Sequence, residues 1–116
     1  MKRRVLVVED DVLIGMMVCD MLEDLGYEPV GPVRGLKEGV ALAETETPLH
    51  AGVLDVNLDG IRSYPIAEAL AARDIPYLFA TGYGSGGLDG WSGEATVLSK
   101  PFDPDALRTA LDRLVS

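Results

Sequence analysis

Apolar residues occur along the chain in two arrangements, as short continuous runs and as longer stretches with helical spacing. The continuous runs are rich in apolar and β-branched residues, which is typical of strands buried on both faces of a sheet. They are residues 4–9, 27–33, 50–56, 77–81 and 96–98. Pro29 and Pro32 interrupt the second run, and because proline cannot donate a ladder hydrogen bond, this strand is predicted at a sheet edge.

The first stretch with helical spacing follows the first strand. Its apolar positions Leu13, Met17, Met21 and Leu25 are four residues apart and so recur on one side of a helix. Beside them on the same side are Ile14, Val18 and Leu22. Gly26 comes next, and glycine is the residue best suited to the left-handed conformation that ends many helices. This pattern predicts a helix that ends at Gly26.

Later helices are recognised mainly by their ends. One is predicted over residues 35–46, one after Ser63 as capping residue, and one after Asp103 with Pro104 at its first position. Residues 82–93 contain six glycines, which disfavours a full-length helix there. Strands that alternate with helices predict βαβ units, wound right-handed around one parallel sheet.

Length and charge narrow the class of protein. A chain of 116 residues fits one domain, residues 1–116. The net charge of −9, from 10 basic and 19 acidic residues, argues against nucleic acid as a partner. No uncharged apolar stretch approaches the ~20 residues of a membrane span, and Glu9 interrupts the only candidate signal-peptide core. The single cysteine, Cys19, excludes an internal disulfide and suits the cytoplasm.

Polar side chains stand where the predicted strands end. Residues 9–11 follow the first strand, Asp55 ends the third, Thr81 the fourth and Lys100 follows the fifth. The carboxyl ends of parallel strands meet at one edge, so these groups are expected to converge. Clustered carboxylates repel unless a cation such as Mg²⁺ neutralises them. A carboxylate there can attack phosphorus, Thr81 can donate to a phosphoryl oxygen, and Lys100 can offset the added charge. The pattern predicts phosphoryl transfer.

Taken together, these residues identify a resemblance that extends over the whole chain. The chain resembles a response-regulator receiver domain of the CheY-like type. The residues that carry the resemblance are Asp10, Asp11, Asp55, Thr81, Lys100, Pro101 and Phe102. It implies an α/β fold with a doubly wound five-stranded parallel sheet in the flavodoxin-like order 2-1-3-4-5, with helices on both faces.

The resemblance also implies roles for single residues. Asp55 would accept a phosphoryl group from the phosphohistidine of a histidine kinase, with kinases of the HWE type among the candidates. Asp10 or Asp11, Asp55 and the backbone carbonyl of Asn57 would hold Mg²⁺. The peptide bond between Lys100 and Pro101 would be cis, a state that is accessible mainly before proline. The phosphorylated chain would then signal to a downstream protein.

Residues 79–84 narrow the resemblance further. Phe79, Ala80, Thr81, Gly82 and Tyr83 are similar to the signature of the "FAT GUY" receivers, which are often stand-alone proteins. Most receivers carry an aromatic residue three positions before the lysine, and here that residue is Val97. The resemblance therefore implies a switch through Thr81 and Tyr83.

Several alternatives remain open at this stage. Residues 9–11 could only cap a helix, and Tyr83 could be a packed loop aromatic. Residues 55–60 match the first half of a calcium-binding EF-hand loop, but its twelfth position, which requires Glu, is Ile66. The chain could act as a phosphate sink or relay rather than a signalling module. A phosphatase-type enzyme of similar fold is disfavoured, because the Asp-x-Asp-x-Thr motif is absent after the first strand; any catalysis is then confined to Asp55 itself.

Overall fold

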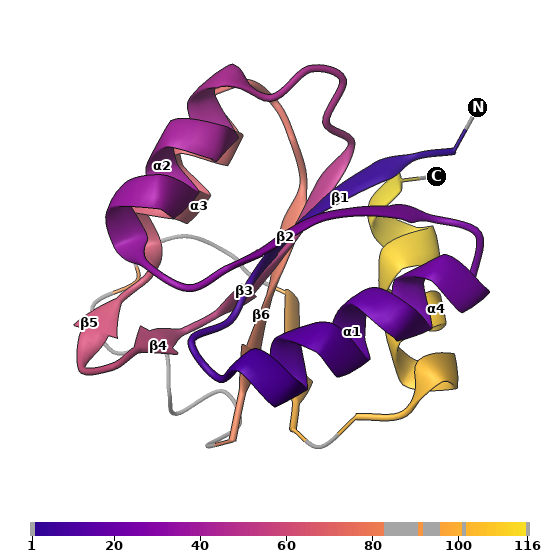
Figure 1. Cartoon of the computed structure of the whole chain (residues 1–116). Helices are drawn as coiled ribbons and strands as arrows, with labels where there is room; N and C mark the ends of the chain where they lie inside the picture. Colours follow the sequence, from indigo (N-terminus) through magenta and orange to yellow (C-terminus); the bar gives the residue numbers. More distant parts are fainter. Residues whose placement is uncertain (1, 83–90, 92–95, 101, 116) are drawn as a thin grey trace.

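A five-stranded parallel sheet forms the centre of the protein (Figure 1). The computed structural model describes residues 2–82, 91, 96–100 and 102–115. The strands lie in the order β2-β1-β3-β6-β7, which in chain order is 2-1-3-4-5, and the predicted order is confirmed. Their bounds are Arg4–Val8 for β1, Glu28–Val33 for β2, Ala51–Asp55 for β3, Tyr77–Thr81 for β6 and Thr96–Ser99 for β7. The strand with two prolines, β2, lies at an edge as predicted.

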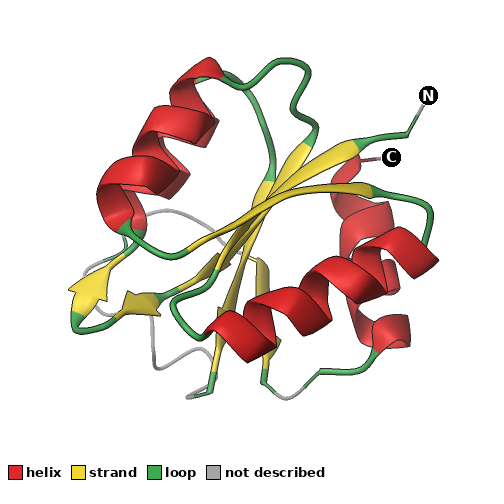
Figure 2. Cartoon of the chain, in the orientation of Figure 1, coloured by secondary structure: helices red, strands yellow, loops and turns green. Residues whose placement is uncertain are grey.

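Helices cover both faces of the sheet, as predicted (Figure 2). One face carries α1 (Val12–Asp24) and α4 (Pro104–Val115), and the other carries α2 (Leu36–Thr45) and α3 (Tyr64–Ala72). Each face has its own apolar core. Val18, Leu22, Leu107 and Leu111 are among the buried residues of the first core, and Ile66 and Phe79 among those of the second. None of the described helices is long and apolar enough to cross a bilayer.

Helix α1 buries only part of the apolar side that its spacing predicts. Gly15, Val18, Cys19 and Leu22 face the sheet, whereas Leu13 is 72% exposed and Met17 55% exposed. Gly15 explains the orientation, because a Cβ there would lie 2.8 Å from the Cβ of Pro32 on β2. The absence of a side chain at Gly15 lets α1 approach the edge strand closely and turns its apolar first turns outward.

Most helix ends follow the sequence prediction. Gly26 has φ of 91° just after α1, and the Asp103 Oδ1 accepts a 2.8 Å hydrogen bond from the Ala106 amide at the start of α4. Ser63 differs from its prediction. It occupies the N-cap position of α3, but with φ −83° and ψ 7° it lacks the extended conformation of a side-chain cap, and it makes no capping bond. Its Oγ is buried without a hydrogen-bond partner among the described residues.

A short antiparallel hairpin follows β3 and was not predicted. Its strands are β4 (Asn57–Leu58) and β5 (Ile61–Arg62). Asp59 and Gly60 form the turn with φ of 53° and 91°, as in two-residue hairpin loops that need positive φ at both positions. The Gly60 amide donates a 2.7 Å hydrogen bond to the Asn57 Oδ1, which closes the turn.

Two predictions concern residues outside the described part of the chain. The predicted switch residue Tyr83 lies outside the described residues, as do most of residues 82–93, which were predicted to form no full-length helix. The predicted cis peptide bond involves Pro101, which also lies outside them. Trp91 is described. Its ring packs against Tyr64 and Phe79, with ring centroids 5.2 and 5.3 Å away. Trp91 therefore joins the core between α3 and β6.

Candidate functional site

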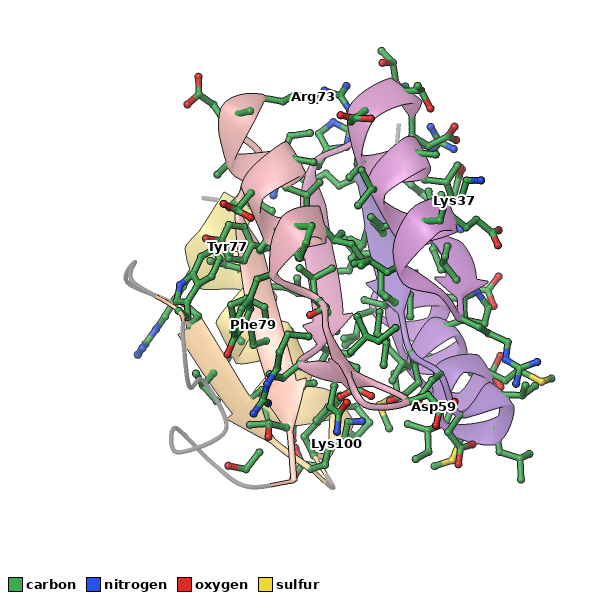
Figure 3. The ribbon with its side chains drawn as sticks, turned by 90° about the vertical axis from the view of Figure 1, so that its left-hand side faces the viewer. Lys37, Asp59, Arg73, Tyr77, Phe79 and Lys100 are labelled. Atoms are coloured by element: carbon green, nitrogen blue, oxygen red, sulfur yellow. The ribbon has the colours of Figure 1, made fainter. Side chains whose placement is uncertain are left out.

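The carboxyl ends of four strands bring the polar residues together at one edge of the sheet. Asp55 is the last residue of β3 and pairs in register with Ala80, and Thr81 is the last residue of β6. The Lys100 amide donates a 2.9 Å hydrogen bond to the Thr81 carbonyl, which fixes the residue after β7 beside the end of β6. Figure 3 shows Lys100 and Asp59 at this end of the molecule, with Arg73 at the opposite end. The predicted convergence of Asp55, Thr81 and Lys100 at one edge is observed.

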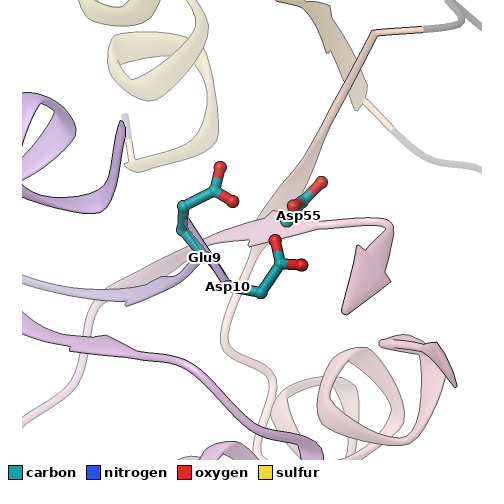
Figure 4. Close-up of side chains that lie close together, drawn as sticks. All are labelled: Glu9, Asp10 and Asp55. Atoms are coloured by element: carbon teal, nitrogen blue, oxygen red, sulfur yellow. The ribbon is translucent and has the colours of Figure 1, made fainter. Parts of the chain in front are cut away.

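Three carboxylates gather at this edge. Glu9, Asp10 and Asp55 each offer an oxygen atom, and these atoms all lie within 4.8 Å of one another (Figure 4). Glu9 is 4% exposed and Asp55 is 8% exposed, so the cluster is set into the protein rather than spread over its surface. Carboxylate oxygens are the ligands that Mg²⁺ prefers. The donor set therefore fits a hard divalent cation.

Asp11 does not join these carboxylates. Its Oδ1 accepts a 3.1 Å hydrogen bond from the Ile14 amide and so caps α1. Of the two aspartates named as alternative ligands, Asp10 is the one beside Asp55, and Asp11 serves the helix. Glu9 was predicted as one of the clustered acids after the first strand, but the resemblance did not name it as a metal ligand. A signal was available, because Glu9 is the first residue after β1 and stands closest to the strand end.

Lys100 is held between two of the carboxylates. Its Nζ lies 2.5 Å from the Glu9 Oε1 and 3.2 Å from the Asp55 Oδ1. Burial alone would lower the pKa of Lys100, but the hydrogen bond with Glu9 and the charges of both carboxylates outweigh it and raise the pKa. Lys100 is therefore a fixed positive charge in direct contact with Asp55.

The acidic groups differ in how readily they ionise. Burial, followed by the hydrogen bond and the negative charge of Glu9, raises the pKa of Asp55 from 3.8 to about 7, against the opposing effect of Lys100. Burial would also raise the pKa of Asp10, but hydrogen bonds with Glu9, Asp55 and the Asp59 amide lower it below its ordinary value. Asp10 is thus the more readily ionised group, and Asp55 is the group that a nearby cation would convert most strongly to its carboxylate form.

The remaining predicted site residues lie around this centre. Thr81 is buried, with 3% of its surface exposed. The Asn57 side chain is exposed, and its Oδ1 accepts the hydrogen bond that closes the hairpin turn. The role of the Asn57 backbone carbonyl as a metal ligand stays a prediction. The Asp59 amide donates a 3.0 Å hydrogen bond to the Asp10 Oδ2, so the hairpin reaches back to the cluster and orients that carboxylate.

Curated proteins and solved structures include relatives of this chain. No protein-family model matches the chain. PdtaR of Mycobacterium tuberculosis, a transcriptional regulatory protein, is 33% identical over 120 residues, which cover 98% of this chain and 57% of PdtaR. The chain thus spans little more than half the length of that curated relative.

Two proteins of known structure are similar to this chain over nearly their whole length. SdrG from Sphingomonas melonis Fr1 is 44% identical with a TM-score of 0.84, and the match covers 99% of this chain and 98% of SdrG. SdrG has also been solved in a BeF3-activated conformation, which matches with a TM-score of 0.81. The receiver domain of the sensor histidine kinase PA1611 from Pseudomonas aeruginosa PAO1 is 25% identical with a TM-score of 0.83, covering 99% of this chain and 98% of that one. Its structure holds a magnesium ion in the active site cleft.

The strand order, the edge cluster and these matches all lead to one family. The five-stranded sheet in the order 2-1-3-4-5 places acidic residues, a threonine and a lysine at its carboxyl edge. SdrG shares the fold over 99% of this chain and is 44% identical to it. The chain belongs to the CheY-like receiver domains of response regulators.

Proposed function

We propose that the chain is the phosphorylatable module of a two-component phosphorelay in the cytoplasm. Asp55 accepts a phosphoryl group from a histidine kinase in a reaction that depends on Mg²⁺, and the phosphorylated form signals to a partner protein. The observation that carries the proposal is the buried Asp55 carboxylate, which lies 3.2 Å from the Lys100 Nζ and within 4.8 Å of the Glu9 and Asp10 oxygens. Such a site suits a nucleophile that takes on negative charge.

Glu9, Asp10 and Asp55 would hold the metal ion, and the Asn57 carbonyl is a further predicted ligand. When bound, Mg²⁺ would supply positive charge that offsets the clustered carboxylates and the phosphoryl oxygens. The protein provides the rest of the site. The Asp59 amide holds the Asp10 carboxylate in place, so the ligand geometry does not depend on a mobile side chain.

The chemical step is a transfer between two covalent partners. An Asp55 carboxylate oxygen forms a bond to phosphorus while the bond from phosphorus to the kinase imidazole nitrogen breaks. The electron pair of that bond returns to the imidazole, which takes up a proton, and Asp55 becomes an acyl phosphate. The reaction requires ionised Asp55, and Lys100 at 3.2 Å favours that form.

Lys100 and Thr81 respond to the new group. The transferred phosphoryl adds about −1.5 to −2 charges at pH 7. Lys100 already contacts Asp55 and can shift its ion pair to a phosphoryl oxygen, while the Thr81 hydroxyl can donate to another. Movement of Thr81 at the end of β6, together with the predicted role of Tyr83, would alter the surface that a partner reads.

The kinase would meet the chain beside α1. Five apolar side chains of its first turns are exposed, and they lie directly after the acidic residues of the site; they are Val12, Leu13, Ile14, Met16 and Met17. Contiguous exposed apolar residues on a small protein mark an interaction surface more often than chance exposure. A kinase helix packed there would deliver its phosphohistidine close to Asp55.

Labelling with a small phosphodonor tests the proposal. Acetyl phosphate with Mg²⁺ should add one phosphoryl group, detected by intact mass spectrometry, and chelation with EDTA should abolish the addition. Asp55→Asn should remain unlabelled, whereas Asp59→Asn, which keeps the hairpin amide, should still be labelled. Equal labelling of wild type and Asp55→Asn would mean that another residue is the acceptor.

Transfer from a panel of histidine kinases identifies the donor class. A partner that binds the beryllofluoride-treated chain more tightly than the untreated chain supports signalling by binding. Rapid transfer onward to a second histidine protein, with no such partner, would instead support the relay alternative.

A further inference from the structure

Arg34 lies at the same edge of the sheet as the acidic cluster, directly after β2. Its Nε donates a 3.3 Å hydrogen bond to the backbone carbonyl of Asp10. Together with Asp10, Gly35 and Asp59 it lines an open polar pocket. Because the Asp10 carboxylate is within 4.8 Å of the Asp55 carboxylate, this pocket adjoins the proposed phosphoacceptor.

In the part of the chain that the structure describes, no second hydrogen bond of the Arg34 guanidinium is found. Within the described ranges it makes no ion pair, although Asp10 and Asp59 line the same pocket. Two other arginines, by contrast, are engaged in contacts within the fold. Arg4 contacts Glu28, Glu46 and the Pro48 carbonyl, and Arg73 donates to two carbonyls and a hydroxyl at the end of α2. Arg34 therefore retains its terminal Nη donors.

A phosphodonor approaching this site meets strong repulsion. The protein carries a net charge of −9, and the carboxylates of Glu9 and Asp10 lie beside the acceptor Asp55. Lys100 is not free to bind the incoming phosphodonor, because its Nζ already forms ion pairs with Glu9 and Asp55. A free guanidinium at the rim is well suited to this task, since its planar pair of N–H donors matches two phosphoryl oxygens.

We propose that Arg34 positions the phosphodonor by binding its phosphoryl oxygens before transfer to Asp55. This inference rests on the proposed function. Arg34 would orient the phosphoryl group, while the bonds that form and break involve Asp55 and the donor. The Nε contact with the Asp10 carbonyl anchors the Arg34 side chain, which lines the pocket.

A purely structural role for Arg34 would have a different signature. If the side chain only held the Asp10 backbone in place, its removal would disturb a metal ligand and weaken Mg²⁺ binding. If it binds the donor, its removal takes a positive charge away from a cation site and leaves Mg²⁺ affinity unchanged or tighter. The affinity for Mg²⁺ therefore separates the two roles.

The test compares Arg34→Gln, Arg34→Lys and the control Lys37→Gln in the full chain. Lys37 is exposed on α2 and does not line this pocket, so its variant removes the same charge from outside the site (Figure 3). Initial rates of Asp55 labelling are measured against acetyl phosphate concentration at saturating Mg²⁺, and Mg²⁺ affinity is measured by calorimetry. Acetyl phosphate has no protein surface, so kinase docking does not enter the result.

Loss of one charged hydrogen-bond donor predicts a roughly 5- to 30-fold higher half-saturating acetyl phosphate concentration for Arg34→Gln, with a nearly unchanged maximal rate. Arg34→Lys should recover part of the loss, and Lys37→Gln should behave like wild type. A parallel fall in Mg²⁺ affinity, or equal effects in Arg34→Gln and Lys37→Gln, would overturn the role of Arg34. Absence of labelling in wild type would instead overturn the proposed function itself.

Discussion

Replacing Asp55 by Asn should stabilise the protein at pH 8, although it removes the proposed acceptor. Burial and the neighbouring Glu9 raise the pKa of Asp55 from 3.8 to about 7. An acid with a higher pKa in the folded state binds its proton more tightly there than in the unfolded chain. Between these two values the stability therefore falls as pH rises; the penalty is absent below about pH 4 and complete above about pH 7.

The structure sets the scale of the effect. A shift of about three pKa units corresponds to ~4 kcal/mol of destabilisation at high pH. This is an upper bound for the gain from Asp55→Asn, because the buried amide also loses contact with water and Lys100 loses one of its two carboxylate partners. We expect a net gain of about 1–3 kcal/mol in the free energy of unfolding at pH 8.

Urea unfolding of wild type and Asp55→Asn in EDTA, at pH 4 and pH 8, measures the difference directly. Asp20→Asn, which removes a carboxylate from an exposed position on α1, is the matched control and should change little at either pH. Added Mg²⁺ should stabilise wild type more than Asp55→Asn, since it binds the folded carboxylates. The reasoning would be refuted if Asp55→Asn were no more stable than wild type at pH 8. It would also be refuted if the difference in free energy of unfolding between the two proteins were the same at pH 4 and pH 8.

Three further predictions concern the surroundings of the site. Leu13→Glu on the exposed side of α1 should slow transfer from the cognate kinase about tenfold or more while leaving acetyl phosphate labelling unchanged; equal rates with the kinase would remove α1 from the docking surface. Gly39→Ala should lower the free energy of unfolding despite a gain of about 1 kcal/mol in helix propensity, because the new Cβ would overlap the Ile66 Cδ1. Ile66→Val, measured by urea unfolding, should therefore cost less stability in the Gly39→Ala background than in wild type. Additive costs would argue against the clash. Burial, with the nearby acids Glu23 and Asp20, raises the pKa of the Cys19 thiol, so a thiol reagent at pH 8 should modify it only after unfolding; rapid modification of the native protein would contradict this.

The strands of the sheet could be predicted because strands buried on both faces consist of continuous runs of apolar residues. Val5, Leu6, Val7 and Val8 are all 0–1% exposed, as continuous apolar runs in parallel sheets predict. Prolines identified β2 as an edge strand. The edge of the sheet that carries the site followed from the same reasoning, because parallel strands deliver their last residues to one place.

The face of α1 could not be predicted from spacing. The helix is apolar on nearly all sides in its first turns, so periodicity alone does not select the buried side. The close approach between Gly15 and Pro32 decides it, and this contact joins residues that belong to different elements. The resulting apolar exposure is information that only the fold supplies.

The choice among three consecutive acids also depended on detail beyond the sequence. Glu9 and Asp10 lie beside Asp55, while Asp11 caps the start of α1. The pairing of β1 with β2 shifts register between Leu6 and Val8, so simple alternation along the strand does not fix where the following side chains point. The hairpin of β4 and β5 was missed because two-residue strands leave no periodic signal.

Trp91 gives the protein an optical property that follows from its packing. It is the single tryptophan of the chain, and its indole N–H is buried without a hydrogen-bond partner among the described residues. Its ring lies 5.3 Å from Phe79, which is two residues before Thr81 on β6. Emission excited at the red edge of the absorption band therefore comes from one indole in an apolar setting, next to the strand that ends at the site. The chain carries its own fluorescent reporter, and its spectrum can be followed without attaching a dye.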